Sequence, residues 1–442
     1  MSKRIRWLRE QLGEWERRGI LTRAQAEEIR ALHPLAESGV SAGTLVFGAL
    51  GAGIAGLGII LLFAYNWQAM GKAAKLAIVL CSLAGAHAGG LWLGSRRPDR
   101  RWLTEILCAL GSMLFGAGIW LIAQIYNIEE HFPNGFLIWA VGTLLLAWAL
   151  RSTVQGVLAA VLFPIWIGVE GWQFSSPVHS GWLWLAGGVG ALAWHLRSRM
   201  LLALVLVGLC VSALALTNAV DDQLILRVLL NLGACFVAVG ALVRGSRGFP
   251  GSAPVWSGVG WPVVLLSLYL LTFSGVTTDL LKWSSEGRTS WEGVAYNWIP
   301  WALAVAPWAL LLWRRVTAPA AGQETLSSEH WFVPASIAAA QLIAGAELAP
   351  RGGSGLVTGL FNLILLAIAA AWMARGCLSA DLRQTMAGSL VFIALVMARY
   401  FDLFQSLAVR GLIFVALGGL LVAQGILFRR ARRLVRAGEQ PA

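Results

Sequence analysis

About fourteen apolar stretches follow one another along this chain, and short polar segments separate them. A helix that crosses a bilayer needs roughly 20 mostly apolar residues, because lipid offers no partners for backbone groups. The pattern predicts an all-α fold, a polytopic helical membrane protein with about 14 transmembrane helices. We place them at residues 40–64, 73–94, 103–123, 135–150, 154–169, 181–196, 201–217, 224–243, 255–276, 298–313, 333–348, 356–374, 382–398 and 407–428.

A short amphipathic segment, residues 1–36, precedes the first of these stretches and is predicted to form a cytoplasmic helical hairpin. Apolar residues recur at helical spacing in both halves, at Ile5, Leu8, Leu12 and Trp15 and then at Ala26, Ile29 and Leu32. Gly19 is expected to end the first helix, and Thr22 with Gln25 forms a capping box for the second. Two helices of this length bury little surface, so we expect self-association or a protein partner.

The predicted domains are therefore the hairpin 1–36, a first transmembrane bundle 38–150, a second transmembrane bundle 151–430 and a basic tail 431–442. The first stretch also carries Gly48, Ala52 and Gly56 four residues apart. Small residues at this spacing predict a close helix contact in lipid, with a pore-lining glycine face as the alternative.

The basic residues predict the orientation of the chain, which has 34 Lys and Arg against 22 Asp and Glu. Cytoplasmic loops of membrane proteins are enriched in Lys and Arg. With an inner amino terminus, the inner loops and tail hold Arg96, Arg97, Arg100, Arg101, Arg151, Arg197, Arg199, Arg244, Arg247, Arg314, Arg315, Arg375, Arg383, Arg429, Arg430, Arg432, Arg433 and Arg436. The outer side holds Lys72, Lys75, Arg227, Lys282, Arg288, Arg351, Arg399 and Arg410. The asymmetry favours a multi-pass protein of the bacterial inner membrane with both termini in the cytoplasm, and it argues against nucleic acid as a partner.

Tyrosine is scarce, and its placement is informative. Tyr65-Asn66-Trp67 recurs as Tyr296-Asn297-Trp298, and Tyr126-Asn127 is a partial third copy. A tyrosine or tryptophan at a membrane interface is usually an anchor. The repeated asparagine is not explained by anchoring, and a recurring tripeptide is too short to establish an inverted repeat.

Several of these landmarks together resemble a known family. They are LGEWERRGILT at residues 12–22, FAYNW at 63–67 and AQIYN at 123–127. The chain is similar there to the domain of unknown function 2157 family of bacterial membrane proteins, best through about residue 150. RYFDLF at 399–404 is similar to a related segment often fused behind that domain. The resemblance implies membrane location and architecture, and it implies no activity or catalytic residues. The hairpin also resembles short bacterial oligomerisation modules.

Polar residues gather on the predicted outer side. Those that we predict to bind a ligand are Tyr65, Asn66, Gln124, Tyr126, Asn127, Arg399, Tyr400 and Asp402. An ionisable group at membrane depth is costly and usually has a partner or a function. Arg399 and Asp402 are three residues apart, so they either pair with each other or leave the guanidinium for a carboxylate or phosphate ligand.

Other polar residues permit a functional and a structural interpretation. One outer loop holds Glu129, Glu130 and His131. We interpret it as a solvated turn in preference to a metal site or a proton site. Glu170 and Glu347 lie near outer helix ends, where they are either linked to protons or extend to the headgroups. Within the stretches, interhelical hydrogen bonding is the preferred explanation for His87, Asn231, Gln341, Asn362 and Gln424.

No motif of a nucleotide motor, zinc protease or serine hydrolase occurs, and we expect no enzyme, cofactor, metal or disulfide. The first functional hypothesis is a bundle that binds or moves a small-molecule or lipid-like solute through an outer-facing polar site. The alternative is a membrane scaffold or sensor whose hairpin recruits a partner or self-associates. An intramembrane enzyme that acts on lipid headgroups ranks last, because the sequence offers no nucleophile or base for it.

Overall fold

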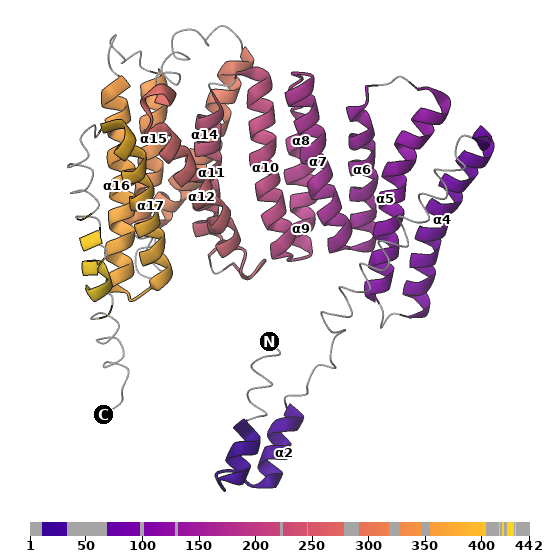
Figure 1. Ribbon diagram of the computed structural model, residues 1–442, viewed down its shortest axis with the longest axis horizontal. Helices are drawn as coiled ribbons and strands as arrows, with labels where there is room; N and C mark the ends of the chain where they lie inside the picture. Colours follow the sequence, from indigo (N-terminus) through magenta and orange to yellow (C-terminus); the bar gives the residue numbers. More distant parts are fainter. Residues whose placement is uncertain are drawn as a thin grey trace. The chain divides into compact units, whose positions relative to one another are not determined.

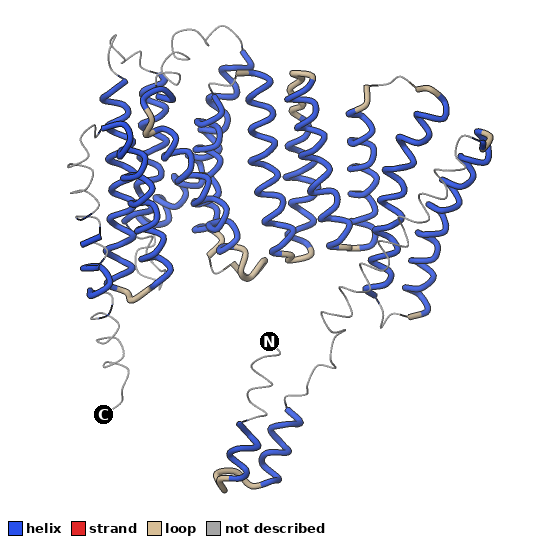
Figure 2. The backbone as a smooth tube through the Cα atoms, viewed as in Figure 1, coloured by secondary structure: helices blue, strands red, loops and turns tan. Residues whose placement is uncertain are grey.

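The computed structural model describes residues 11–32, 69–97, 101–128, 131–221, 224–244, 246–277, 291–317, 328–345 and 354–403, with 415, 418, 419, 422–427 and 429. Every regular element in these ranges is helical (Figure 2). The chain divides into two compact units, Met1–Ile78 and Val79–Ala442. The expectation of an all-α fold is confirmed for these ranges, whereas the predicted division into bundles at residue 150 stays a prediction.

The hairpin forms as the sequence predicts, from a helix at residues 11–17 and α2 (Arg23–Leu32). Gly19 follows the first helix with a left-handed φ of +71°. The Thr22 amide donates to Gln25 Oε1 over 3.0 Å, and the Gln25 amide donates to Thr22 Oγ1 over 3.4 Å, which are the two bonds of a capping box. Leu12 and Ala26 are fully buried, so the hairpin has a small apolar core of its own.

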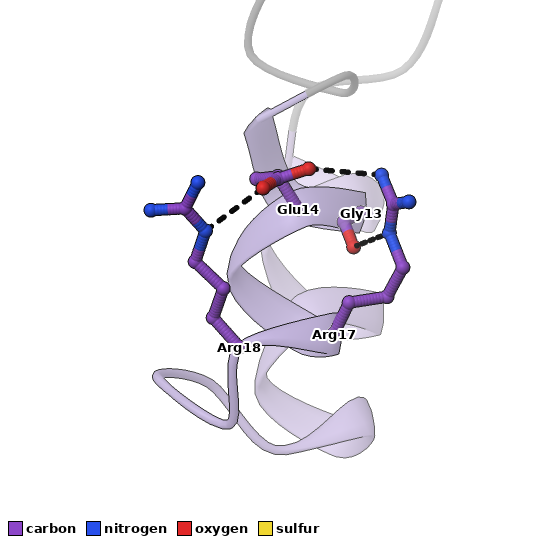
Figure 3. Close-up of polar contacts among 4 residues, drawn as sticks. All are labelled: Gly13, Glu14, Arg17 and Arg18. Atoms are coloured by element: carbon purple, nitrogen blue, oxygen red, sulfur yellow. Dashed lines mark hydrogen bonds and ion pairs between the residues drawn. The ribbon is translucent and has the colours of Figure 1, made fainter.

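The surface of the hairpin carries charge. Glu14 accepts hydrogen bonds from Arg17 and Arg18 at 2.9 and 2.8 Å (Figure 3). Arg17 also donates to the Gly13 carbonyl over 3.2 Å. Exposed pairs of this kind stabilise a helix by only about 0.3–0.5 kcal/mol each. They therefore make the surface of the hairpin hydrophilic rather than holding it together.

In the second unit the helices run alternately up and down (Figure 1). In chain order they are α4 (Lys72–Arg96, which begins in the first unit), α5 (Arg101–Tyr126), α6 (Pro133–Leu150), α7 (Thr153–Gln173), α8 (Ser180–Trp182), the π-helix η3 (Leu183–Gly190), α9 (Ala191–His195), α10 (Arg199–Val220), α11 (Ile225–Leu242), α12 (Ala253–Leu271), α14 (Trp291–Thr317), the 3₁₀ turn η6 (Ser328–Trp331), α15 (Phe332–Gly345), α16 (Ser354–Leu378) and α17 (Leu382–Leu403).

Nine helices in the described part of the chain are long and apolar enough to cross a membrane: α4 to α7, α10, α11, α12, α14 and α16. The predicted stretches 181–196, 333–348 and 382–398 correspond to the α8–η3–α9 segment, α15 and α17. The predicted stretch 40–64, with Gly48, Ala52 and Gly56, lies outside the described residues, as does most of 407–428. The count of fourteen therefore stays a prediction.

The alternation gives the helices of this unit two ends. We call one the arginine-rich end, because its connections carry Arg97, Arg151, Arg197 and Arg244, and Arg383 lies in the first turn of α17. The connections α5–α6, α7–α8 and α10–α11 lie at the other end, which we call the far end.

Two apolar cores hold these helices together. The first lies among α6, α7, η3, α9 and α10, around Phe163, Leu185 and Leu206. The second lies among α11, α12, α14, α15 and α16, around Val264, Trp308 and Phe361. Phe236 and Leu232 of α11 pack against the first core, so the two cores meet at α10 and α11. α6 and α7 share one core across the predicted boundary at residue 150.

α7 and α10 approach each other unusually closely. A Cβ on Gly171 of α7 would collide with the backbone carbonyl of Ala215 in α10. Near the middle of both helices, a Cβ on Gly208 would lie 2.9 Å from Cγ of Pro164. Pro164 stands inside α7 and has no amide hydrogen for the Ala160 carbonyl. The two glycines therefore permit a contact that runs from the kink-prone centre of α7 to its far end.

We predict that Gly171→Ala destabilises the protein, because the obstacle is a backbone atom and α10 as a whole would have to move. The expected cost is about 1–3 kcal/mol, the usual range for overpacking. The measurement is the thermal unfolding midpoint of the purified protein in detergent.

The control is Gly258→Ala in α12, where a Cβ would meet no atom within 4 Å. Alanine should preserve or raise stability there, because it restricts the unfolded chain more than glycine does. Equal midpoints for the two variants would contradict the close contact.

Candidate functional site

A histidine and a glutamate meet at the far end. Nε2 of His131 lies 2.9 Å from Oε1 and 3.0 Å from Oε2 of Glu170. Glu170 belongs to the last turn of α7 and is only 5% exposed. The imidazole of His131, which precedes α6, is 39% exposed. The pair therefore joins a buried carboxylate to a group that reaches the surface.

Local backbone geometry fixes both partners. The Glu170 carbonyl accepts hydrogen bonds from the amides of Phe174 and Ser176, at 3.2 and 3.0 Å. Ser175 between them has a left-handed φ of +50°, so the chain turns sharply after α7. On the other side, Pro133 occupies the first turn of α6, where its fixed φ suits a helix start.

Two phenylalanines flank the pair. The ring of Phe174 meets the His131 ring edge-on, with 4.4 Å between centroids, and Phe132 lies 5.6 Å from Phe174. Both phenylalanines are more than two-fifths exposed. Exposed aromatic rings at the end of an apolar helix are typical of a membrane–water interface, which puts the imidazole close to water.

A second buried polar pair lies at the same end, between α11 and α14. Arg227 Nη1 donates to Oδ1 of Asn297 over 2.8 Å. Arg227 is 2% exposed and Asn297 is 4% exposed. A buried guanidinium is tolerated only where it is solvated by protein groups. The Asn297 amide oxygen supplies part of that solvation.

Tyr296, the neighbour of Asn297, packs against the first core and against a small cluster around Ala213, Leu224 and Val228. Its ring lies 5.5 Å from the ring of His179. Three segments therefore meet around Tyr296 and its neighbour Asn297. Arg227 belongs to α11 and Tyr296 to α14, whereas His179 lies in the turn before α8.

The repeated Tyr-Asn dipeptide has different surroundings in its two described copies. Asn297 lies inside α14 and binds the buried arginine. Asn127 follows α5 with a left-handed φ of +51°, and the next amide, of Ile128, donates to the Ala123 carbonyl over 2.9 Å. Asparagine is favoured at this capping position, so Asn127 has a structural explanation.

The structure describes only some of the eight predicted ligand-binding residues. Gln124, Tyr126 and Asn127 are exposed at the far end of α5, whereas Tyr65 and Asn66 lie outside the described residues. Arg399, Tyr400 and Asp402 belong to α17, but only their backbone is described. α5 packs on α6 and α7, and α17 packs on α16, on the opposite side of the second unit (Figure 1). The structure does not bring these two groups together, and the eight-residue site stays a prediction.

The other predicted polar residues divide in the same way. Glu129, Glu130 and Glu347 lie outside the described residues. Asn362 of α16 donates to the Thr272 carbonyl over 3.3 Å, and Ser389 of α17 donates to Gln424 over 2.9 Å, which confirms interhelical bonding for Asn362 and Gln424. For His87, Asn231 and Gln341 this bonding stays a prediction.

α7 also carries polar groups at its arginine-rich end. Ser112 of α5 donates to Oε1 of Gln155 over 2.8 Å, and both residues are buried. Nε2 of Gln155 is buried and has no hydrogen-bond partner among the described residues. One turn nearer the end, Ser152 donates to the carboxylate of Glu105 and caps the Gln155 amide. Gln155 and Ser152 did not stand out in the sequence, because Gln155 stands at the start of the predicted stretch 154–169 and Ser152 precedes it.

Nothing in the described ranges gathers three His, Cys, Asp or Glu side chains as a metal site would. The five cysteines, all of them described, are free.

The long apolar helices define a multi-pass helical membrane protein. Residues 13–156 match the model of a family whose description is predicted membrane protein (DUF2157). The resemblance in the amino-terminal third is therefore confirmed for residues 13–156. Neither the curated proteins nor the solved structures contain a match to the chain.

We predict that Asn297→Ala destabilises the protein by about 1–3 kcal/mol, because it removes one hydrogen-bond acceptor of a buried guanidinium. Asn297→Asp is the matched variant, since it keeps an oxygen at the same place and adds a compensating charge. Thermal unfolding in detergent should show a loss with alanine and near-complete rescue with aspartate. A larger loss with aspartate than with alanine would contradict the proposed role of the Asn297 oxygen.

Proposed function

We propose that the protein binds a small or amphipathic solute and moves it through the membrane along α7. The observation that carries this proposal is the construction of α7. It is an interior helix that packs against α5, α6, α8, η3, α9 and α10, yet it bears buried polar groups at both ends. A helix that only filled the core would need neither Gln155 nor Glu170, because buried polar groups are costly in lipid.

The middle of α7 supports the same proposal. Pro164 frees the Ala160 carbonyl, and beside it η3 is a π-helix, with Trp184 stacked on Phe163 at 6.0 Å. Proline and π-helical turns are the usual places where membrane helices bend. Transporters often carry such broken helices near the bilayer midplane. A bend at this level would let the two polar ends of α7 open in turn.

The chemistry of the surface favours a solute with a large apolar part. Charged side chains are few along the described helices, and the far end of α5 presents Gln124, Tyr126 and Asn127 to the exterior of the bundle. These neutral groups suit a polar headgroup, whereas the helices offer apolar surface to a lipid-like remainder.

We further propose that the arginine-rich end faces the cytoplasm, since Lys and Arg accumulate in cytoplasmic loops. Both termini are then cytoplasmic, in the inner membrane of a bacterium. Reporters fused after residue 97 should show cytoplasmic activity, and reporters fused after residue 128 should show periplasmic activity. The reverse pattern would overturn the orientation, and the far end would then face the cytoplasm.

The transport pathway is tested with a thiol probe that requires no knowledge of the solute. In a chain whose five cysteines are replaced by serine or alanine, Ala160→Cys places a thiol beside the proline of α7. The matched control is Ala234→Cys in α11. Both alanines are buried, with 3% and 0% exposure. A water-soluble thiosulfonate reagent should label Ala160→Cys markedly faster, because only α7 is proposed to open to water.

Equal resistance of both thiols would contradict a pathway along α7 and would favour the alternative, a membrane-anchored scaffold. The separate core and charged surface of the hairpin support that alternative. A scaffold acts through the hairpin, so a chain without residues 2–36 would lose its partner. In the transport proposal that shortened chain keeps the labelling of Ala160→Cys.

A further inference from the structure

The His131–Glu170 pair has a property that solute movement does not require. We infer that His131 and Glu170 form a proton-binding site that takes up one proton from the water at the far end. This inference goes beyond the proposed function and stands whether or not the bundle moves a solute.

The first step concerns the carboxylate. Glu170, in the last turn of α7, is almost completely buried beside the approach to α6, where an isolated negative charge is strongly disfavoured. Its two oxygens lie at nearly equal distances from one imidazole nitrogen, so a single N–H serves both. A neutral imidazole gives a hydrogen bond but no compensating charge, and the pair then carries a net charge of minus one.

The second step concerns the imidazole. Histidine changes its charge between about pH 5 and pH 8. A neutral ring that donates from Nε2 carries its lone pair on Nδ1, and that atom accepts the incoming proton. Proton uptake gives an imidazolium beside a carboxylate, which is neutral overall. The proton comes from bulk water and forms the Nδ1–H bond. No other covalent bond forms or breaks, and no group is oxidised or reduced.

The third step concerns access. More than a third of the His131 side chain is exposed, beside Phe132 and Phe174 at the predicted interface, whereas Glu170 is shielded. The exposed group is therefore the one that gains and loses the proton, and the buried group supplies the charge that attracts it. Because His131 lies just before α6 and Glu170 belongs to α7, the proton also strengthens the contact between the start of α6 and the end of α7.

Other titratable groups could obscure this site. At the far ends of the elements that pack on α7, the described titratable groups are Tyr126 at the end of α5, His179 before α8 and Asp221 after α10. α6 itself carries none. His179 is the other histidine among these groups, so His179→Gln is a necessary control.

The test is a double-mutant cycle on the full chain in lipid nanodiscs. Thermal unfolding midpoints are measured for wild type, His131→Gln, Glu170→Gln and the double variant, at about pH 5.5 and about pH 8.5, on either side of the histidine range. Glutamine keeps hydrogen-bonding groups at both positions and removes only the ability to ionise. The coupling between the two positions should be large at the lower pH and mostly lost at the higher pH, because the attraction depends on the imidazolium.

Two controls separate this result from a general effect of pH. The cycle of Ser112→Ala with Gln155→Ala probes a buried pair that joins α5 to α7 and cannot titrate, and its coupling should be the same at both pH values. The cycle repeated in His179→Gln should retain its pH dependence. A His131–Glu170 coupling that is equal at both pH values, or larger at the higher pH, would overturn the inference.

A second measurement does not depend on the stability of the variants. The chain has six histidines, and ring NMR signals of histidine-labelled protein can be assigned to His131 by their loss in His131→Gln. The His131 signal should change between about pH 5 and pH 8 in the wild type. A signal that stays constant over that range would equally overturn the inference.

Discussion

The close contact between α7 and α10 is the interaction on which the first core and its polar groups depend. In lipid, apolar side chains gain little by leaving the hydrocarbon for a helix surface, so membrane helices associate where small residues let their backbones touch. Gly171 and Gly208 provide that contact at two levels. Glu170 is the neighbour of Gly171 and is only 5% exposed, so the buried carboxylate lies next to this contact along α7.

Hydrogen bonds then fix which neighbours α7 meets on its other side. Gln155 binds Ser112 of α5 near one end, and Glu170 binds His131 before α6 near the other. An apolar surface alone permits neighbouring helices to slide or rotate, whereas buried polar groups have few satisfactory partners. The two bonds therefore select one register among three consecutive helices, and the glycine contacts close the remaining face.

Local features were predictable from the sequence, and long-range pairings were not. The capping box at Thr22 and the turn at Gly19 depend on residues a few positions apart, so the pattern contains all that is needed. The apolar stretches likewise predict helices. In contrast, Arg227 and Asn297 are 70 positions apart, and His131 and Glu170 are 39 apart. The spanning helices are apolar on every side, so no polar face indicates which neighbour each helix meets. Arg227 did give a signal, because it lies inside a predicted apolar stretch rather than in a loop.

Two buried charged residues at the far end, Arg227 and Glu170, have partners of different chemistry. The partner decides whether the contact can depend on pH. Arginine stays charged at any physiological pH, and Asn297 gives Arg227 a neutral oxygen, so this contact is the same under all conditions. Glu170 could have been paired in the same permanent way by an arginine or a lysine. The chain instead places beside it a histidine that is partly open to water. A lasting cation would have sufficed for packing, whereas under the inferred proton uptake a histidine makes the contact between the start of α6 and α7 depend on pH.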